Sequence, residues 1–193
     1  MHIIGITGPA GAGKDTAAAY LVKRLGRPWR VASFADPFKA MLREGLSLSE
    51  AQLYGDEKGV TDPRYGKTPR ELLQTLGTQW GRDMVGRDVW VEAMAARIGP
   101  AGRVVIPDVR FENEADMVRR RRGRVLHIKG RGGIDGDHAS EPGVELMRGD
   151  AVVWNGGTVS ELYDRIDAVF DSLVSPCLPR AAGATWPANI PRS

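Results

Sequence analysis

The residues best suited to chemistry form a glycine-rich run near the start of the chain, Gly8-Pro9-Ala10-Gly11-Ala12-Gly13-Lys14. The backbone N–H groups of such a run, with the dipole of a following helix, can hold a triphosphate. The glycines permit tight turns and close approach to phosphate oxygens, and Lys14 can reach the β and γ phosphates. The spacing fits the Walker A form up to the lysine, after which come Asp15 and then the hydroxyl of Thr16. A glycine-rich turn with a surface lysine is the alternative.

A second candidate is Asp108, which follows an apolar run as a Walker B carboxylate does. A turn or helix-cap residue is the other interpretation. Asp15 beside a triphosphate would require a cation, so we expect Mg²⁺, with Asp15, Thr16 and Asp108 as candidate ligands. Asp15 could also cap the first helix.

The elements that must position these residues alternate between strand and helix. Apolar runs predict strands at 2–7, 30–34, 103–107, 124–128 and 151–154. Helical spacing predicts helices at 16–25, 38–42, 69–76, 88–98, 112–122 and 159–173, the last capped by Thr158 or Ser160. This alternation is typical of an α/β fold, with a parallel sheet covered by helices on both faces. We expect one domain over residues 1–174 and a Pro-rich tail over 175–193 that wraps the surface or is mobile.

Composition excludes several classes of protein. The 193 residues include a single cysteine, Cys177, which excludes an intrachain disulfide and a cysteine metal cage. No apolar run approaches the ~20 residues of a membrane span, and no leader with a long apolar core is evident. We therefore expect a soluble, cytoplasmic protein without a membrane partner.

The charge is slightly basic, with 27 Lys+Arg against 24 Asp+Glu. Of these cations 21 are Arg and 6 are Lys, which fits phosphate chemistry but also coding bias. The densest run is Arg119 to Arg122, with Arg124 close behind. Successive helical residues point around more than one face, so we interpret this run as mostly a solvated helix end.

The loop form Gly-Pro-x-Gly-x-Gly-Lys-x-Thr resembles that of nucleoside monophosphate kinases. Six further segments, 33–39, 68–78, 88–91, 107–110, 138–141 and 155–158, follow in an order that resembles bacteriophage deoxynucleoside monophosphate kinases. The resemblance runs from about residue 3 to 170. It implies a P-loop kinase fold, with a helical acceptor-binding insertion over about 37–98 and a lid over about 129–145.

The resemblance also implies an activity: ATP-dependent phosphorylation of deoxynucleoside monophosphates by in-line, Mg-assisted transfer. Its partners would be small nucleotides, without stable nucleic-acid binding, in the host cytoplasm if the gene is phage-encoded. A homodimer is left open. No covalent intermediate or strong general base is required, because a phosphate monoester is already anionic near neutral pH.

Roles for single residues follow from the resemblance and from the charge that phosphoryl transfer must neutralise. For catalysis we expect Lys14, Asp108, Arg110 and Arg131, with Lys129 as an alternative to Arg131. For ATP the residues are Gly8, Gly11, Ala12, Gly13, Lys14, Asp15, Thr16, Asn155 and Gly156. The loop at 155–158 can pack on the base or be a plain turn and helix cap.

For the acceptor the candidates are Asp36, Lys39, Lys58, Arg70, Gln74, Trp80, Arg82, Arg131, His138 and Glu141. Lys39 and Arg70 are favoured, whereas Lys58 and Arg82 fit a solvated surface equally well. Trp80 and Trp90 offer stacking faces but fit a core as well, so the base preference cannot be read. A metal site on His138 and Glu141 is disfavoured, since no other His or Cys is nearby.

Two other functions fit the sequence less well. One is a P-loop kinase of another phosphorylated metabolite, such as dephospho-coenzyme A or phosphomevalonate. The other is a nucleotide-dependent nucleic-acid-binding module that uses the Arg119 to Arg124 run as its phosphate face; it would bind DNA with a strong salt dependence.

Overall fold

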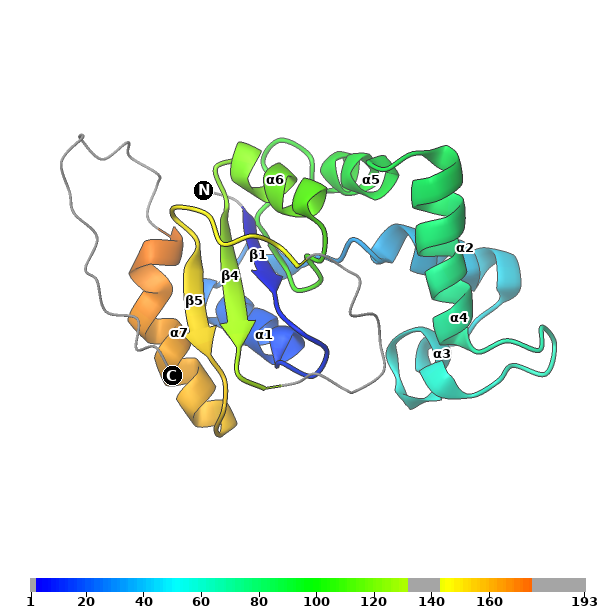
Figure 1. The fold of residues 1–193 in the computed structure, drawn as a ribbon, viewed down its shortest axis with the longest axis horizontal. Helices are drawn as coiled ribbons and strands as arrows, with labels where there is room; N and C mark the ends of the chain where they lie inside the picture. The colour runs from blue at the N-terminus through cyan, green and yellow to red at the C-terminus, as the bar shows by residue number, and fades with distance from the viewer. Residues whose placement is uncertain (1–2, 132–142, 175–193) are drawn as a thin grey trace.

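A five-stranded parallel sheet forms the centre of the protein (Figure 1), as seen in a computed structural model that describes residues 3–131 and 143–174. Its strands are β1 (Ile3–Thr7), β2 (Arg30–Val31), β3 (Val104–Ile106), β4 (Arg124–Lys129) and β5 (Ala151–Trp154), in the order β2-β3-β1-β4-β5. All neighbouring strands are parallel. The carboxyl ends of the strands therefore meet at one edge of the sheet, which we call the carboxyl edge, and their amino ends meet at the opposite, amino edge.

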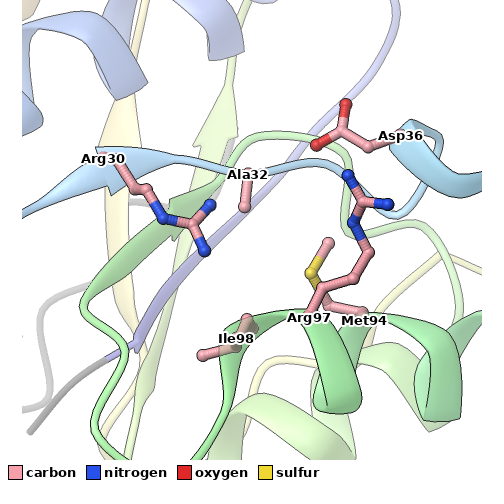
Figure 2. A pocket seen from close by; sticks show the side chains of 6 residues that line it. All are labelled: Arg30, Ala32, Asp36, Met94, Arg97 and Ile98. Carbon is pink, nitrogen blue, oxygen red and sulfur yellow. The ribbon is translucent and has the colours of Figure 1, made fainter. Parts of the chain in front are cut away.

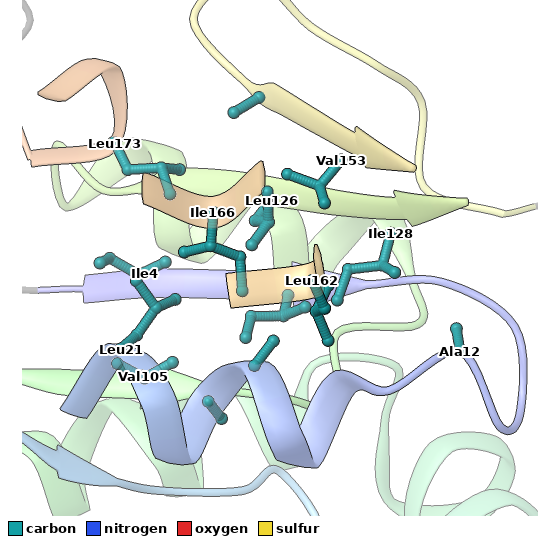
Figure 3. Packing of buried hydrophobic residues seen from close by; sticks show 14 residues of the cluster. Ile4, Ala12, Leu21, Val105, Leu126, Ile128, Val153, Leu162, Ile166 and Leu173 are labelled. Atoms are coloured by element: carbon teal, nitrogen blue, oxygen red, sulfur yellow. The ribbon is translucent and has the colours of Figure 1, made fainter. Parts of the chain in front are cut away.

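Helices cover both faces of the sheet. On one face α1 (Lys14–Leu25) and α7 (Val159–Val174) pack through Leu21, Leu162 and Ile166 against Ile4 and Leu126 of the strands (Figure 3). On the other face α5 (Val89–Ile98) and α6 (Glu112–Arg120) close a second core around buried residues of β1, β3 and β4. The central strands β1, β3 and β4 are buried on both faces, which explains why they read as continuous apolar runs rather than alternating ones, whereas residues of β5 alternate between buried and exposed.

The segment between β2 and β3 is a helical insertion that extends to one side of the sheet (Figure 1). It comprises α2 (Asp36–Leu46), α3 (Glu50–Tyr54), the 3₁₀ helix η1 (Asp56–Gly59), α4 (Pro69–Gln74), the π-helix η2 (Thr75–Val85) and α5. Leu42, Leu48 and Leu53 form a small core of its own. We propose that this insertion is the acceptor-binding part predicted at about 37–98.

The predicted α/β fold is confirmed, and most helix and strand positions agree. The bounds of two elements were wrong, and one helix was missed. The strand at 30–34 is only two residues long, because the chain turns away from β3 after Ala32. The helix predicted to end near 76 continues to Val85 as η2, and α3 was not predicted. Of the two caps predicted for α7, Thr158 is confirmed, since its hydroxyl accepts from the Glu161 N–H.

Glycines obscured the η2 helix in the sequence. Gly77 and Gly81 lie in its middle, where glycine normally argues against a helix. A Cβ at position 81 would lie 2.5 Å from the Trp90 ring, so the close approach of that indole requires glycine. None of the helices in the described ranges is long and apolar enough to cross a bilayer. The predicted tail at 175–193 lies outside the described residues.

Candidate functional site

The loop between β1 and α1 is held in its curved form by glycines in unusual backbone conformations. Gly8 has φ 151°, and a Cβ there would lie 2.5 Å from the Ile128 carbonyl oxygen. Gly13 has φ 91° and directly precedes the first turn of α1. The Lys14 side chain folds back over the loop, where its Nζ donates to the carbonyls of Gly8 (2.8 Å) and Pro9 (2.7 Å). The predicted strand, loop and helix arrangement is thus present.

Asn155 supports this loop from the end of β5. Its side chain is buried, and Nδ2 donates to the Ala12 carbonyl at 2.9 Å. Nδ2 also lies 2.8 Å from the position of a Cβ on residue 13, which is a further reason for glycine there. The amide of Asn155 therefore shapes the phosphate loop, while the neighbouring Gly156 is exposed at the same edge.

Two cations approach each other beside the loop. Burial lowers the pKa of Lys14, and the positive charge of Arg110 lowers it further; the carboxylates of Asp15 and Asp108 act in the opposite direction. Arg110 is exposed and follows β3 at the carboxyl edge. Two positive charges near each other raise the free energy of the site unless an anion lies between them.

Asp108 ends the β3 segment and accepts three hydrogen bonds from the start of the insertion. Its donors are the Ser33 hydroxyl and the backbone N–H groups of Phe34 and Ala35, the last two at 3.0 and 3.1 Å. Desolvation raises the pKa of this carboxyl, although those hydrogen bonds oppose the shift. Asp108 therefore fixes the turn at the entry of the insertion, as the turn-residue interpretation predicts, and its Walker B role stays a prediction.

A second group of cations lies in the insertion. Burial lowers the pKa of Lys39, and the charge of Lys58 adds to the effect. The Lys39 ammonium lies 4.0 Å from the centre of the Tyr54 ring. Asp36 and Asp108 are close enough to oppose the shift, which places Lys39 between the insertion and the phosphate loop. Tyr54 was not anticipated, because nothing in its local sequence distinguishes it from a surface tyrosine.

The remaining acceptor candidates differ in exposure. Arg70 and Gln74 lie on α4 and are exposed, and Trp80 on η2 is 38% exposed. Trp90 is buried and donates from Nε1 to the Gly77 carbonyl at 2.6 Å, so it is a core aromatic. Arg131 is exposed, with a 3.4 Å contact to the Gly157 carbonyl. His138 and Glu141, and most of the predicted lid, lie outside the described residues.

Arg82 does not occupy a solvated surface position. Its side chain is 16% exposed and pairs with Glu114 at 2.8 Å, while another nitrogen donates to the Gly77 carbonyl. The guanidinium also lies over the Phe111 ring, 4.2 Å from its centre. Glu114 escaped the sequence interpretation, because a glutamate in the first turn of a helix normally faces solvent.

The interpretation of the arginine run as a solvated helix end was wrong for three of its members. Arg119 pairs with Asp150 at 2.7 Å and with Glu112 at 3.2 Å. Arg121 donates to the Gly99 carbonyl at the end of α5, and Arg124 donates to the Gly149 carbonyl. Only Arg120 and Arg122 are exposed. Guanidinium groups suit these sites because one fork can satisfy several acceptors.

A separate hollow lies between β2 and α5 (Figure 2). Its lining residues are Arg30, Ala32, Asp36, Met94, Arg97 and Ile98. In Figure 2 the Arg97 guanidinium points toward the Asp36 carboxylate. That carboxylate accepts the Ser33 N–H at 2.8 Å. The hollow therefore adjoins the start of the insertion rather than the phosphate loop.

The oxygen-bearing side chains near the phosphate loop suit a magnesium ion bound mainly by phosphate, rather than an ion enclosed by protein ligands alone. Over residues 3–131 and 143–174, no group of three or more His, Cys, Asp or Glu residues could hold a metal ion. Mg²⁺ commonly uses only one or two protein ligands together with phosphate oxygens and water. Asp15 and Thr16, in the first turn of α1, and Asp108 are of the required oxygen-donor type.

Comparisons with known proteins identify relatives over most of the chain. The family model described as "Deoxynucleotide monophosphate kinase" matches residues 58–166. The chain is 36% identical over 192 residues to the "Putative deoxynucleotide monophosphate kinase" of Acanthamoeba polyphaga mimivirus, covering 89% of this chain and 97% of that protein.

Two phage proteins are similar over shorter stretches. The deoxynucleotide monophosphate kinase of Enterobacteria phage T4 is 30% identical over 103 residues, which cover 50% of this chain and 43% of that one. The deoxynucleoside-5'-monophosphate kinase of Escherichia phage T5 is 33% identical over 88 residues, covering 40% of this chain and 35% of that one.

Proposed function

Because this chain belongs to the deoxynucleotide monophosphate kinase family, we propose that it transfers the γ-phosphate of ATP to deoxynucleoside monophosphates. The observation that carries the proposal is that Lys14 and Arg110 lie near each other beside the phosphate loop, and that Lys39 lies near Asp15 and Asp108 at the same carboxyl edge. In the part of the chain that the structure describes, none of these three cations forms an ion pair with a carboxylate. Two anionic substrates would supply the missing negative charge.

In the proposed mechanism, the loop from Gly8 to Thr16 holds the phosphates of ATP. Lys14 exchanges its carbonyl partners on Gly8 and Pro9 for β- and γ-phosphate oxygens, and Asn155 keeps the loop in shape. Gly156 lies at the base side of this site, and Asp15, Thr16 and Asp108 are the groups that would hold Mg²⁺ or its waters. The ion supplies neutralisation of the β- and γ-phosphate charge.

The acceptor lies between the phosphate loop and the insertion. We assign its phosphate to Lys39, with Lys58 and Arg70 as further cations, and its nucleoside to Asp36, Gln74 and Trp80. Arg110 and Arg131 stabilise the charge on the transferred group. The acceptor phosphate attacks the γ-phosphorus in line as the bond to the β-γ bridging oxygen breaks, giving ADP and a deoxynucleoside diphosphate. Positioning and electrostatics supply most of the catalysis.

One assay tests this proposal directly. The purified chain is incubated with Mg-ATP and, in turn, each deoxynucleoside monophosphate, each ribonucleoside monophosphate, dephospho-coenzyme A and phosphomevalonate. We expect ADP and a diphosphate product to form in equal amounts with at least one deoxynucleotide. Turnover with none of the nucleotides would overturn the proposal, and turnover confined to another metabolite would redirect it to that acceptor.

A further inference from the structure

Arg110 stands on a short loop whose two ends are each fixed by a carboxylate. At the first end, Asp108 accepts hydrogen bonds from Ser33, Phe34 and Ala35 at the entry of the insertion. At the second end, one oxygen of Glu114 accepts the backbone N–H groups of Arg110 (2.8 Å) and Phe111 (3.2 Å). The main chain that carries Arg110 is thus held from both sides.

The second carboxylate is also joined to the insertion. The other oxygen of Glu114 pairs with Arg82 of η2 at 2.8 Å, across 32 positions of sequence. Arg82 donates in addition to the Gly77 carbonyl of its own helix at 2.8 Å. A single guanidinium therefore bridges the acceptor-binding insertion and the turn of α6 that holds Arg110.

The Arg82–Glu114 pair is buried, so removing either side chain would leave the other charge buried without its partner. The Glu114 side chain is 2% exposed and the Arg82 side chain 16%. The Phe111 ring covers the guanidinium. Burial raises the pKa of Glu114, although the hydrogen bond from the Arg110 N–H and the charge of Arg82 oppose this shift, so removing Arg82 would leave a buried carboxylate with less compensation.

We propose that Arg82 and Glu114 are positioning residues for phosphoryl transfer: Glu114 fixes the main chain at Arg110, and Arg82 couples it to the insertion that brings the acceptor. The expected effects on kcat rest on the proposed function, whereas the expected effects on the main chain at Arg110 do not. Arg82 is accordingly left out of the proposed acceptor contacts, since its donors are engaged by the protein.

The test compares Arg82→Met with Arg119→Met. Arg119 supplies a matched control, because its pair with Asp150 has nearly the same length (2.7 Å) and side-chain exposures of 18% and 2%. We expect both variants to lose similar thermal stability. Arg82→Met should lower kcat about 10- to 100-fold, the scale of a misplaced catalytic group, with the KM for ATP within about 3-fold. Arg119→Met should keep kcat within about 2-fold of the wild type. Equal kcat effects in the two variants would overturn the proposal.

A double-mutant cycle shows whether Arg82 acts through Arg110. If it does, Arg82→Met should have little further effect on kcat in an Arg110→Met background. Multiplicative effects would contradict the proposal. If Arg82→Met fails to fold, Glu114→Gln replaces it in the cycle, because this variant loses the charge and leaves only a weaker, neutral acceptor for the two backbone N–H groups. Wild-type kcat in Glu114→Gln would also overturn the proposal.

Amide hydrogen exchange separates this proposal from the proposed function. The N–H groups of Arg110 and Phe111 should lose protection in the Arg82 or Glu114 variant and keep it in Arg119→Met. If the wild type phosphorylates no nucleotide but the exchange pattern holds, the function fails and the positioning of this loop stands. Unchanged protection in the Arg82 and Glu114 variants would overturn the positioning whatever the activity.

Discussion

The basic side chains at the two edges of the sheet differ in their surroundings. At the carboxyl edge, Lys14, Lys39 and Arg110 lie near other cations, and burial and like charge lower the pKa values of both lysines. At the amino edge, Arg119 and Arg121 are engaged by carboxylates or by helix-end carbonyls. Cations held near one another raise the free energy of a site until an anion binds between them, whereas cations paired with carboxylates or carbonyls join elements of the fold. The arginine surplus of the sequence therefore divides into a binding part and a structural part.

The largest effect should come from Lys14, the cation closest to the phosphate loop backbone. Lys14→Ala should lower turnover by roughly 10²- to 10³-fold, because it removes positive charge from the site where negative charge is transferred. The melting temperature should change little, since among the described residues the side chain bonds only to carbonyls of its own loop. Steady-state kinetics and thermal unfolding measure the two effects.

Lys23→Ala is a matched control, since Lys23 is an exposed lysine in the last turn of the same helix. We expect it to leave turnover unchanged. If Lys14→Ala kept wild-type turnover, the result would contradict the assignment of the ATP site to this loop. It would also contradict the contrast drawn between the two edges of the sheet.

Asp150→Asn should have the reverse profile: reduced stability with unchanged kcat. His127 and Arg119 hold the pKa of this carboxyl at about 2, below the ordinary value of 3.8. Its stabilising contribution is therefore fully present above pH 4 and is lost as the pH falls through about 2. The shift corresponds to about 2 kcal/mol of unfolding free energy at pH 7.

Urea unfolding between pH 7 and pH 3 tests this. We expect the difference between Asp150→Asn and the wild type to shrink at the acid end of the range. A constant difference across that range, or a 10-fold loss of kcat in the folded variant, would show that the amino edge is not merely structural.

The sequence was informative where backbone chemistry left a local pattern. The glycines and lysine of the phosphate loop, the apolar strands and the position of Asp108 all follow from short segments, and the fold class follows from their alternation. The ordered motifs also indicated the kinase family correctly.

Long-range pairing left no such pattern. Glu114 and Arg82 are 32 residues apart, and Asp150 and Arg119 are 31 apart, so nothing local distinguishes these side chains from solvated ones. The η2 helix was missed for the same reason, because its Gly81 is required by Trp90 of a different helix. Contacts between residues that are distant in the chain could therefore not be predicted from the sequence alone.

The smallest effect should come from Arg120 and Arg122, the two exposed members of the arginine run at the amino edge. Replacing both with Gln should change the free energy of unfolding by less than about 0.5 kcal/mol and leave kcat unchanged, because neither lies near the phosphate loop.

The same variant, with Arg120 and Arg122 replaced by Gln, tests the nucleic-acid hypothesis. If these arginines formed a phosphate face, the wild type would bind DNA with an affinity that falls steeply with salt, and the variant would lose about two units of that slope. We expect neither protein to show such binding in a fluorescence anisotropy titration from 50 to 200 mM salt, the range over which phosphate contacts weaken most visibly. A steep slope that the double variant reduces would give the amino edge a binding role and end its contrast with the carboxyl edge.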